Sequence, residues 1–130
     1  MIGGIVLTHG QMASAIVEAA GTIIGKTEKI FTISTSEYSL RSLIAKLEKL
    51  ISDEKFDQGV IIMASLKGGT CWNVAVAVAR KFPTKVEVVS GVNLNMFISF
   101  VTKREQFELS KLAEIIYEDG IRGIELYKIN

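Results

Sequence analysis

The chain contains a single histidine, and its position makes it a candidate nucleophile. His9 follows a largely apolar run, Ile2–Thr8, and precedes Gly10. A neutral imidazole nitrogen can attack a phosphoryl group, hold it as a phosphohistidine and pass it on. A lone histidine at a strand end is otherwise often structural or merely exposed. Whether His9 is functional therefore depends on which other groups lie near it. The flanking Thr8 and Gly10 are candidate supporting residues.

The stretch SLKGGTCWN, residues 65–73, has the features of an anion-binding loop. Gly68 and Gly69 free the backbone to turn sharply and expose its N–H groups, and we expect Thr70 to cap the helix that follows. Unpaired amides at a helix start suit a phosphate, and Lys67 adds a full positive charge. The loop lacks GxxxxGK[ST], so it does not predict a nucleoside triphosphatase. An ordinary turn with a solvated lysine is the competing interpretation.

A third turn, SGVNLNM at residues 90–96, adds Asn93 and Leu94 as candidate supporting residues, and Ser65 opens the second turn. The three turns hold no metal-ligand cluster and no paired carboxylates, so we expect neither a metal nor a cofactor. Nothing around Cys71 argues for an activated thiol, and we expect it to pack at the helix start. The three turns therefore predict phosphoryl chemistry carried by an imidazole and backbone amides.

Apolar runs of strand length alternate with longer segments of helical period. The predicted strands are Ile2–Thr8, Lys29–Ser34, Gly59–Ala64 and Val86–Ser90. The predicted helices are Gly10–Gly25, Ser39–Asp53, Thr70–Phe82, Leu94–Thr102 and Gln106–Asp119. Continuous runs such as GVIIMA are typical of strands covered on both faces, which indicates a parallel sheet. Ile124–Ile129 alternates in polarity and predicts a final strand.

This order predicts a three-layer α/β fold with a mostly parallel sheet. We expect the flavodoxin-like strand order 2-1-3-4, followed by the final strand at Ile124–Ile129. Strand 1 then lies beside strand 3, and a crevice opens between their carboxyl ends, where ligands bind. His9 and the loops after the third and fourth strands would meet there.

Composition narrows the class of protein. With 130 residues, we expect one domain over residues 1–130. A net charge of +1 provides no strong positive potential that would attract nucleic acid or an anionic membrane. One cysteine, no long apolar run and no basic leader indicate a cytoplasmic protein. The apolar cluster at residues 96–101 is open to two interpretations, a subunit interface or ordinary core.

Three motifs in order, GIVLTHG, GGT-x-x-N and SGVNL-x-M, resemble the EIIA domain of the mannose-type sugar phosphotransferase system. The resemblance covers essentially the whole chain. It implies a cytoplasmic phosphoryl carrier, typically a homodimer, with a parallel sheet that has a C-terminal edge strand. It implies no membrane contact except through the transporter complex. His9 would accept phosphate from HPr, itself charged by enzyme I, and pass it to EIIB. Thr70 and its amides would bind the phosphoryl oxygens, and Asn93 and Leu94 would form the adjoining turn.

Some residues depart from the family pattern. Where the family has an aspartate, a phenylalanine and a proline, this chain has Ser65, Lys67 and Cys71, and Asn95 replaces a further common proline. The aspartate is expected to fix the histidine tautomer, as carboxylates behind functional histidines do. A serine hydroxyl can accept from a ring N–H but carries no charge. Lys67, if it points inward, would attract phosphate.

Three functions stay open at this point. The first is a carrier that feeds EIIB during sugar uptake, with no EIIB or HPr module expected in the same chain. The second is the same carrier supplying a dihydroxyacetone kinase. The third is a regulatory or binding relative whose transfer is impaired because Ser65 replaces the aspartate.

Overall fold

A central strand, β1 (Gly3–Thr8), organises the sheet of this computed structural model, which describes residues 1–54 and 56–129. Around it lie β2 (Ile30–Ser34), β3 (Val60–Ala64) and β4 (Val86–Val89), all parallel and in the order β2-β1-β3-β4. Leu7 in β1 lies opposite Ile33 in β2 and Ala64 in β3. The predicted order 2-1-3-4 is therefore confirmed.

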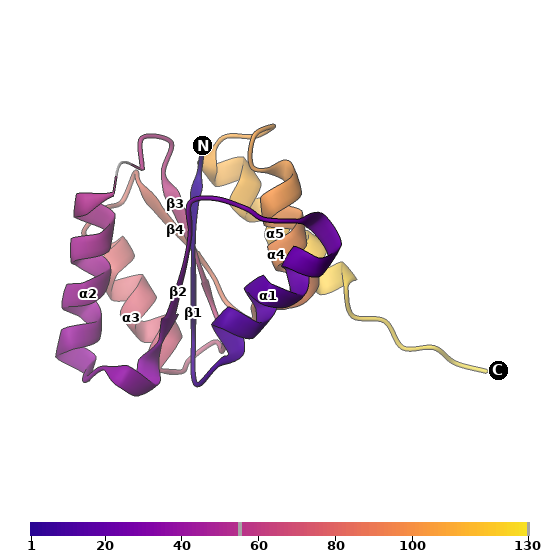
Figure 1. Cartoon of the computed structure of the whole chain (residues 1–130), viewed down its shortest axis with the longest axis horizontal. Helices are drawn as coiled ribbons and strands as arrows, with labels where there is room; N and C mark the ends of the chain where they lie inside the picture. Colours follow the sequence, from indigo (N-terminus) through magenta and orange to yellow (C-terminus); the bar gives the residue numbers. More distant parts are fainter. Residues whose placement is uncertain (55, 130) are drawn as a thin grey trace.

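Five α-helices cover the sheet (Figure 1). They are α1 (Met12–Ile24), α2 (Leu40–Asp53), α3 (Thr70–Ala79), α4 (Leu94–Lys103) and α5 (Leu109–Arg122), and a short 3-10 helix, η1 (Thr35–Glu37), follows β2. Helices α2 and α3 lie on one face, and α1, α4 and α5 lie on the other (Figure 1). The fold is the three-layer α/β architecture that the alternating pattern predicts.

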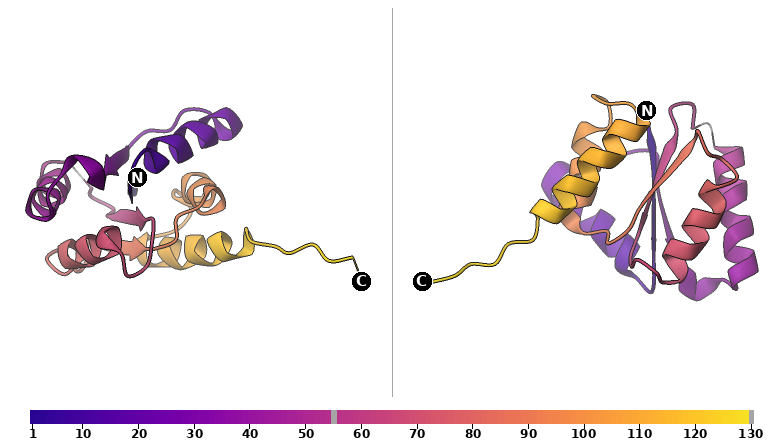
Figure 2. Two further views of the ribbon diagram at one scale, coloured as in Figure 1. Left: turned by 90° about the horizontal axis from the view of Figure 1, so that it is seen from below. Right: turned by 180° about the vertical axis from the view of Figure 1, so that it is seen from behind.

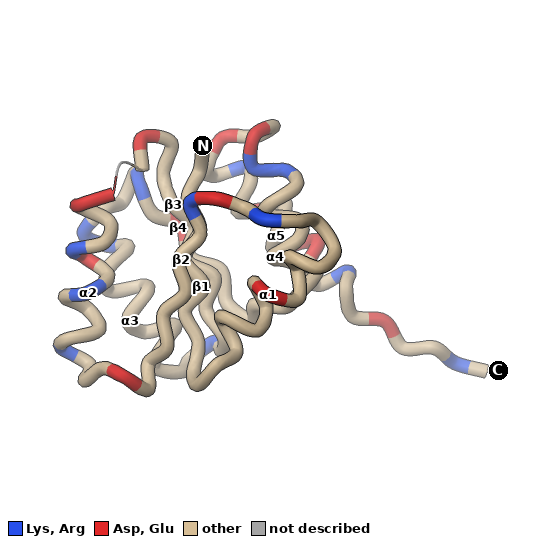
Figure 3. Tube along the Cα trace, viewed as in Figure 1, with Lys and Arg blue, Asp and Glu red and all other residues tan. Residues whose placement is uncertain are grey.

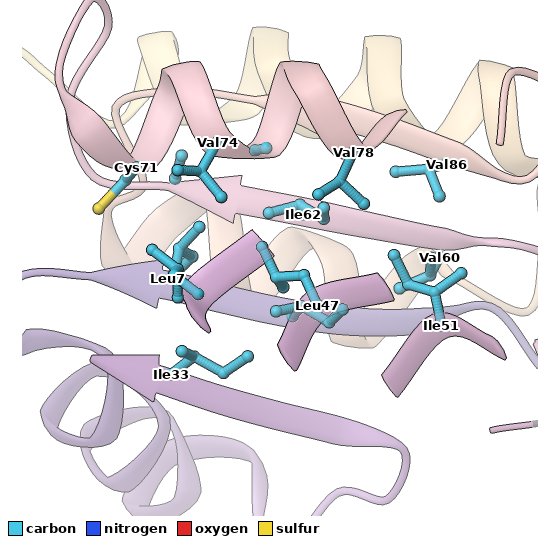
Figure 4. Packing of buried hydrophobic residues seen from close by; sticks show 14 of the residues in the cluster. Leu7, Ile33, Leu47, Ile51, Val60, Ile62, Cys71, Val74, Val78 and Val86 are labelled. Carbon is cyan, nitrogen blue, oxygen red and sulfur yellow. The ribbon is translucent and has the colours of Figure 1, made fainter. Parts of the chain in front are cut away.

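Each face of the sheet has its own apolar cluster. The first lies under α2 and α3 and includes Leu7, Leu47, Ile62 and Val78 (Figure 4). The second lies under α1, α4 and α5, and it buries Met96, Phe97 and Phe100. These three side chains are core, so their interpretation as a subunit interface is wrong.

The predicted C-terminal edge strand is also wrong for this chain. Ile124–Ile129 has no regular secondary structure and pairs with no strand of the described sheet. The tail leaves the end of α5 and runs away from the body (Figures 1 and 2). Its large side chains, Ile124, Leu126, Tyr127 and Ile129, are 75–88% exposed. A strand needs a partner edge for its backbone groups, and the path of this tail reaches none.

Some helix ends also differ from the prediction. Helix α3 ends at Ala79, three residues before Phe82, because the backbone turns at Lys81 and Phe82. Helix α1 ends where expected, with Gly25 closing it at φ +78°. In the described chain, no helix is long and apolar enough to span a membrane.

Candidate functional site

His9 lies in the turn between β1 and α1, at the carboxyl end of the central strand, and is exposed. Thr8 before it is fully buried, and its Oγ1 accepts a hydrogen bond from the Ala13 N–H at 2.8 Å. This bond ties the end of β1 to the first turn of α1. Gly10 after it has a φ of +55°, a conformation that favours glycine. The backbone on both sides of the imidazole is thus held in place while the ring faces solvent.

The Nδ1 nitrogen of the His9 ring is held by the segment that follows the neighbouring strand β2. His9 Nδ1 lies 2.8 Å from Thr35 Oγ1, and the Gly10 N–H donates to Ser36 Oγ at 3.2 Å. Both hydroxyls belong to η1, directly after β2. These residues lie outside the site predicted from the sequence, which joined His9 only to the loops after β3 and β4. The signal was available, since the order 2-1-3 places the end of β2 beside the end of β1.

The other ring nitrogen faces the start of α3. His9 Nε2 lies 4.0 Å from Cys71 Sγ, and the Ser65 hydroxyl donates to the same sulfur at 3.4 Å. Ser65 therefore reaches the imidazole only through Cys71. Cys71 is buried at the helix start, as expected, and its sulfur points away from the other side chains of the first apolar cluster (Figure 4).

The start of α3 leaves backbone donors open. Gly69, not Thr70, is the N-cap residue, because its backbone is extended while Thr70 is already helical. This corrects the predicted capping role of Thr70. The Gly69 N–H donates to the Leu66 carbonyl, so it belongs to the turn, and Gly68 shapes that turn with a φ of +80°.

Side-chain capping sets α3 apart from the other described helices. Ser39, Asn93 and Glu108 cap α2, α4 and α5, and Thr8 serves α1. No side chain of the described residues accepts from the first turn of α3. First-turn amides have no partner within the helix, so those of α3 are available to an external acceptor such as an anion.

Three other candidate residues have their contacts elsewhere. Asn93 Oδ1 accepts from the Met96 N–H, and its Nδ2 donates to the Gly120 carbonyl, so it joins α4 to α5. Leu94 packs against the second apolar cluster. Lys67 is exposed and lines a hollow beside β4 together with the half-buried Trp72. The structure thus brings the His9 ring to α3 and η1, with Asn93 and Leu94 supporting the scaffold.

The arrangement suits nucleophilic transfer to an anionic group. One imidazole nitrogen is anchored, and the other points toward unpaired amides and a helix start, which favour negative charge. Among the described residues, no group of three or more His, Cys, Asp or Glu side chains forms a metal site. The geometry therefore places an exposed imidazole beside a helix start that has no side-chain cap.

The sequence is similar to those of known proteins. Residues 3–117 match the EIIA-man family, described as the PTS system fructose IIA component. The sorbose-specific EIIA component of the PTS system from Klebsiella pneumoniae is 25% identical over 114 residues, covering 88% of this chain and 83% of that protein.

Solved structures show the same fold. The phosphotransferase system component EIIA from Streptococcus agalactiae is 26% identical, with a TM-score of 0.88 and 96% of each chain covered. The mannose/sorbose-specific IIA subunit of the phosphotransferase system from Enterococcus faecalis is 25% identical, with a TM-score of 0.86. That comparison covers 99% of this chain and 96% of the Enterococcus chain.

Proposed function

The chain belongs to the EIIA-man family of phosphotransferase-system components, and from this premise we propose that it carries a phosphoryl group on His9. HPr would be the donor and an EIIB component the acceptor, in the cytoplasm. The observation that carries the proposal is the placement of the His9 ring. Its Nδ1 is anchored by Thr35 at 2.8 Å, while its Nε2 faces the uncapped start of α3.

The transfer is a simple displacement. The lone pair of a neutral His9 ring nitrogen forms a bond to the phosphorus of the donor's phosphohistidine. The donor's P–N bond breaks, and its electron pair returns to the donor imidazole. First-turn amides of α3 would stabilise the negative charge on the three phosphoryl oxygens. The same exchange then runs from His9 to the acceptor, so no water or metal takes part.

The surface around His9 supports docking of protein partners. Met12, Leu40 and Leu66 each lie near the carboxyl end of a strand and are 41%, 59% and 60% exposed. Helix α1, beside His9, carries one charged residue, Glu18 (Figure 3). Exposed apolar side chains close to a reactive group are typical of a contact surface for another protein.

The exposed tail supports a homodimer. Ile124–Ile129 alternates in polarity and has no partner edge in its own sheet, while β4 is an edge strand with a hollow beside it. Pairing of the tail with the edge of a second copy would bury apolar side chains and satisfy backbone groups on both. Light scattering on the chain with and without residues 124–129 tests this: the full chain should be a dimer and the truncated chain a monomer.

The central experiment is a phosphoryl-transfer assay. The purified chain is incubated with labelled phosphoenolpyruvate, enzyme I and HPr, and the acid-labile phosphate on the chain is counted. We expect stoichiometric labelling of the wild type and none of His9→Ala. The Thr84→Val variant, at the opposite end of the sheet, serves as the matched control and should label like the wild type. Labelling of His9→Ala at the wild-type rate would end the proposal.

A further inference from the structure

We propose that Thr35 is the positioning residue of His9, accepting the Nδ1–H and thereby leaving Nε2 as the atom that receives the phosphoryl group. The inference rests on the proposed carrier function, and it assigns a role to a residue outside the three sequence motifs. The opening observation is the 2.8 Å distance between Nδ1 and Thr35 Oγ1.

Thr35 is held firmly enough to orient a ring. It is half-buried and is the first residue of η1. Its carbonyl accepts from the Tyr38 N–H at 3.2 Å, and Ser34 Oγ caps η1 by accepting from the Ser36 N–H. Ser36 Oγ in turn accepts from the Gly10 N–H. The two segments are thus joined at consecutive residues, which restricts the ring to one orientation relative to η1.

The other side of the ring offers no competing oxygen. Ser65 Oγ bonds to the Cys71 sulfur, and Thr35 Oγ1 is the one side-chain oxygen bonded to the ring within residues 1–54 and 56–129. In this chain, therefore, a hydroxyl from the connection after β2 takes the anchoring role, and Ser65 does not.

The contacts on the two sides of the ring favour one tautomer. The Ser65 O–H donates to Cys71 Sγ, which leaves the thiol hydrogen free to point toward Nε2 at 4.0 Å. A ring nitrogen that faces a donor keeps its lone pair, so the ring hydrogen lies on Nδ1 and Thr35 accepts it. Nε2 is then the nucleophile, and it is also the nitrogen that faces the start of α3.

Thr35 also acts during transfer. As the bond from Nε2 to phosphorus forms, the ring gains positive charge, and the Nδ1–H becomes a stronger donor to Thr35 Oγ1. Without this acceptor, the ring hydrogen can move to Nε2 and block attack. Loss of Thr35 should therefore slow the chemical step and leave partner binding unchanged.

The first test reads the tautomer without any phosphoryl transfer. Long-range proton–nitrogen NMR of histidine-labelled protein at about pH 8, above the ordinary histidine pKa, identifies the protonated ring nitrogen. We expect Nδ1–H in the wild type, in Thr35→Ser and in the Thr84→Val control. Thr35→Val, which keeps the shape but removes the hydroxyl, should shift the ring toward Nε2–H. An Nε2–H wild type, or a Thr35→Val ring unchanged from wild type, overturns the proposal.

The second test measures transfer from HPr. For Thr35→Val we expect kcat to fall roughly 10-fold with KM for HPr unchanged, and Thr35→Ser to recover to within about 2-fold of wild type. The phosphoryl group should be found on Nε2, and its detection on Nδ1 overturns the inference. If the wild type takes up no phosphate at all, the carrier function fails, while the tautomer measurement still decides the role of Thr35.

Discussion

The two ends of the sheet are built by different means. At the amino end, Gly3 and Gly4 lie so close to the rings of Phe56 and Phe100 that a Cβ would come within 2.3–2.8 Å of ring carbons. Arg104, 4% exposed, donates to the carbonyls of Ile2 and Glu28. At the carboxyl end, exposed His9 is held through one hydroxyl.

The difference separates stability from reactivity. Close packing and a buried cation make the amino end costly to alter. Burial lowers the pKa of Arg104, and the nearby negative charges of Glu105 and Glu28 act in the opposite direction. The amino end of the sheet therefore contains a charged side chain within its packed interior. The carboxyl end leaves amides and a ring nitrogen open, which costs stability little because water reaches them. Substitutions at the two ends should therefore change different measured quantities.

The largest expected effect is at the amino end. Phe56, 1% exposed, packs edge-on against Phe31 and against Gly3. Phe56→Ala should lower the free energy of unfolding by about 3–5 kcal/mol, since it leaves a cavity. Urea denaturation measures the loss. Transfer per folded molecule should stay near wild type, and a selective loss of transfer in the folded fraction would contradict the separation of the two ends.

The matching change at the carboxyl end is Thr70→Pro. Proline is tolerated as the first residue of a helix, and the extended Gly69 before it suits a following proline. The substitution removes the backbone N–H of Thr70, at the start of α3, together with the Thr70 hydroxyl. We expect kcat for phosphoryl uptake to fall on the order of 10²-fold, with the free energy of unfolding changed by less than about 1 kcal/mol. Undiminished transfer would show that neither the amide nor the hydroxyl of Thr70 contacts the phosphoryl group.

The smallest expected effect is on the pH dependence of stability. It comes from Asp119, which lies between the two ends of the sheet. Asp119 joins α5 to α4, and hydrogen bonds from Lys103 and Ser99, each 2.6 Å long, hold the pKa of its carboxyl below the usual value. The unfolded chain therefore binds the proton at higher pH than the folded one. This stabilisation is complete above the ordinary aspartate pKa of about 3.9 and is lost as pH falls through the lower folded value.

The Asp119→Asn variant isolates that contribution. It should reduce the free energy of unfolding at neutral pH by about 0.5–1 kcal/mol, the range for partly exposed pairs. The deficit should shrink as acid protonates Asp119 in the wild type. Chemical denaturation at pH 7, 4 and about 2.5 measures the trend, and a deficit that is constant across this range would rule out the ion pair as its source. Transfer should not change.

Much of the fold was predictable from local pattern. Continuous apolar runs such as Val60–Ala64 indicated buried parallel strands, and the apolar stripe from Leu43 to Ile51 indicated the helix face that packs on them. Ile124–Ile129 shows that a local pattern is not sufficient to predict a strand. Its alternating polarity satisfies a strand pattern, but a strand also needs a neighbouring edge, and that is a property of the chain's path in space.

For the site, the sequence alone identified the candidate nucleophile and the loop at the start of α3, because an imidazole after a strand and a glycine pair before a helix are local chemical features. Tertiary structure alone decided what holds the imidazole. Thr35 is 26 residues from His9 and meets it only because β2 lies beside β1. Hydrogen bonds act over about 3 Å, so the anchor of a side chain is set by which strands become neighbours.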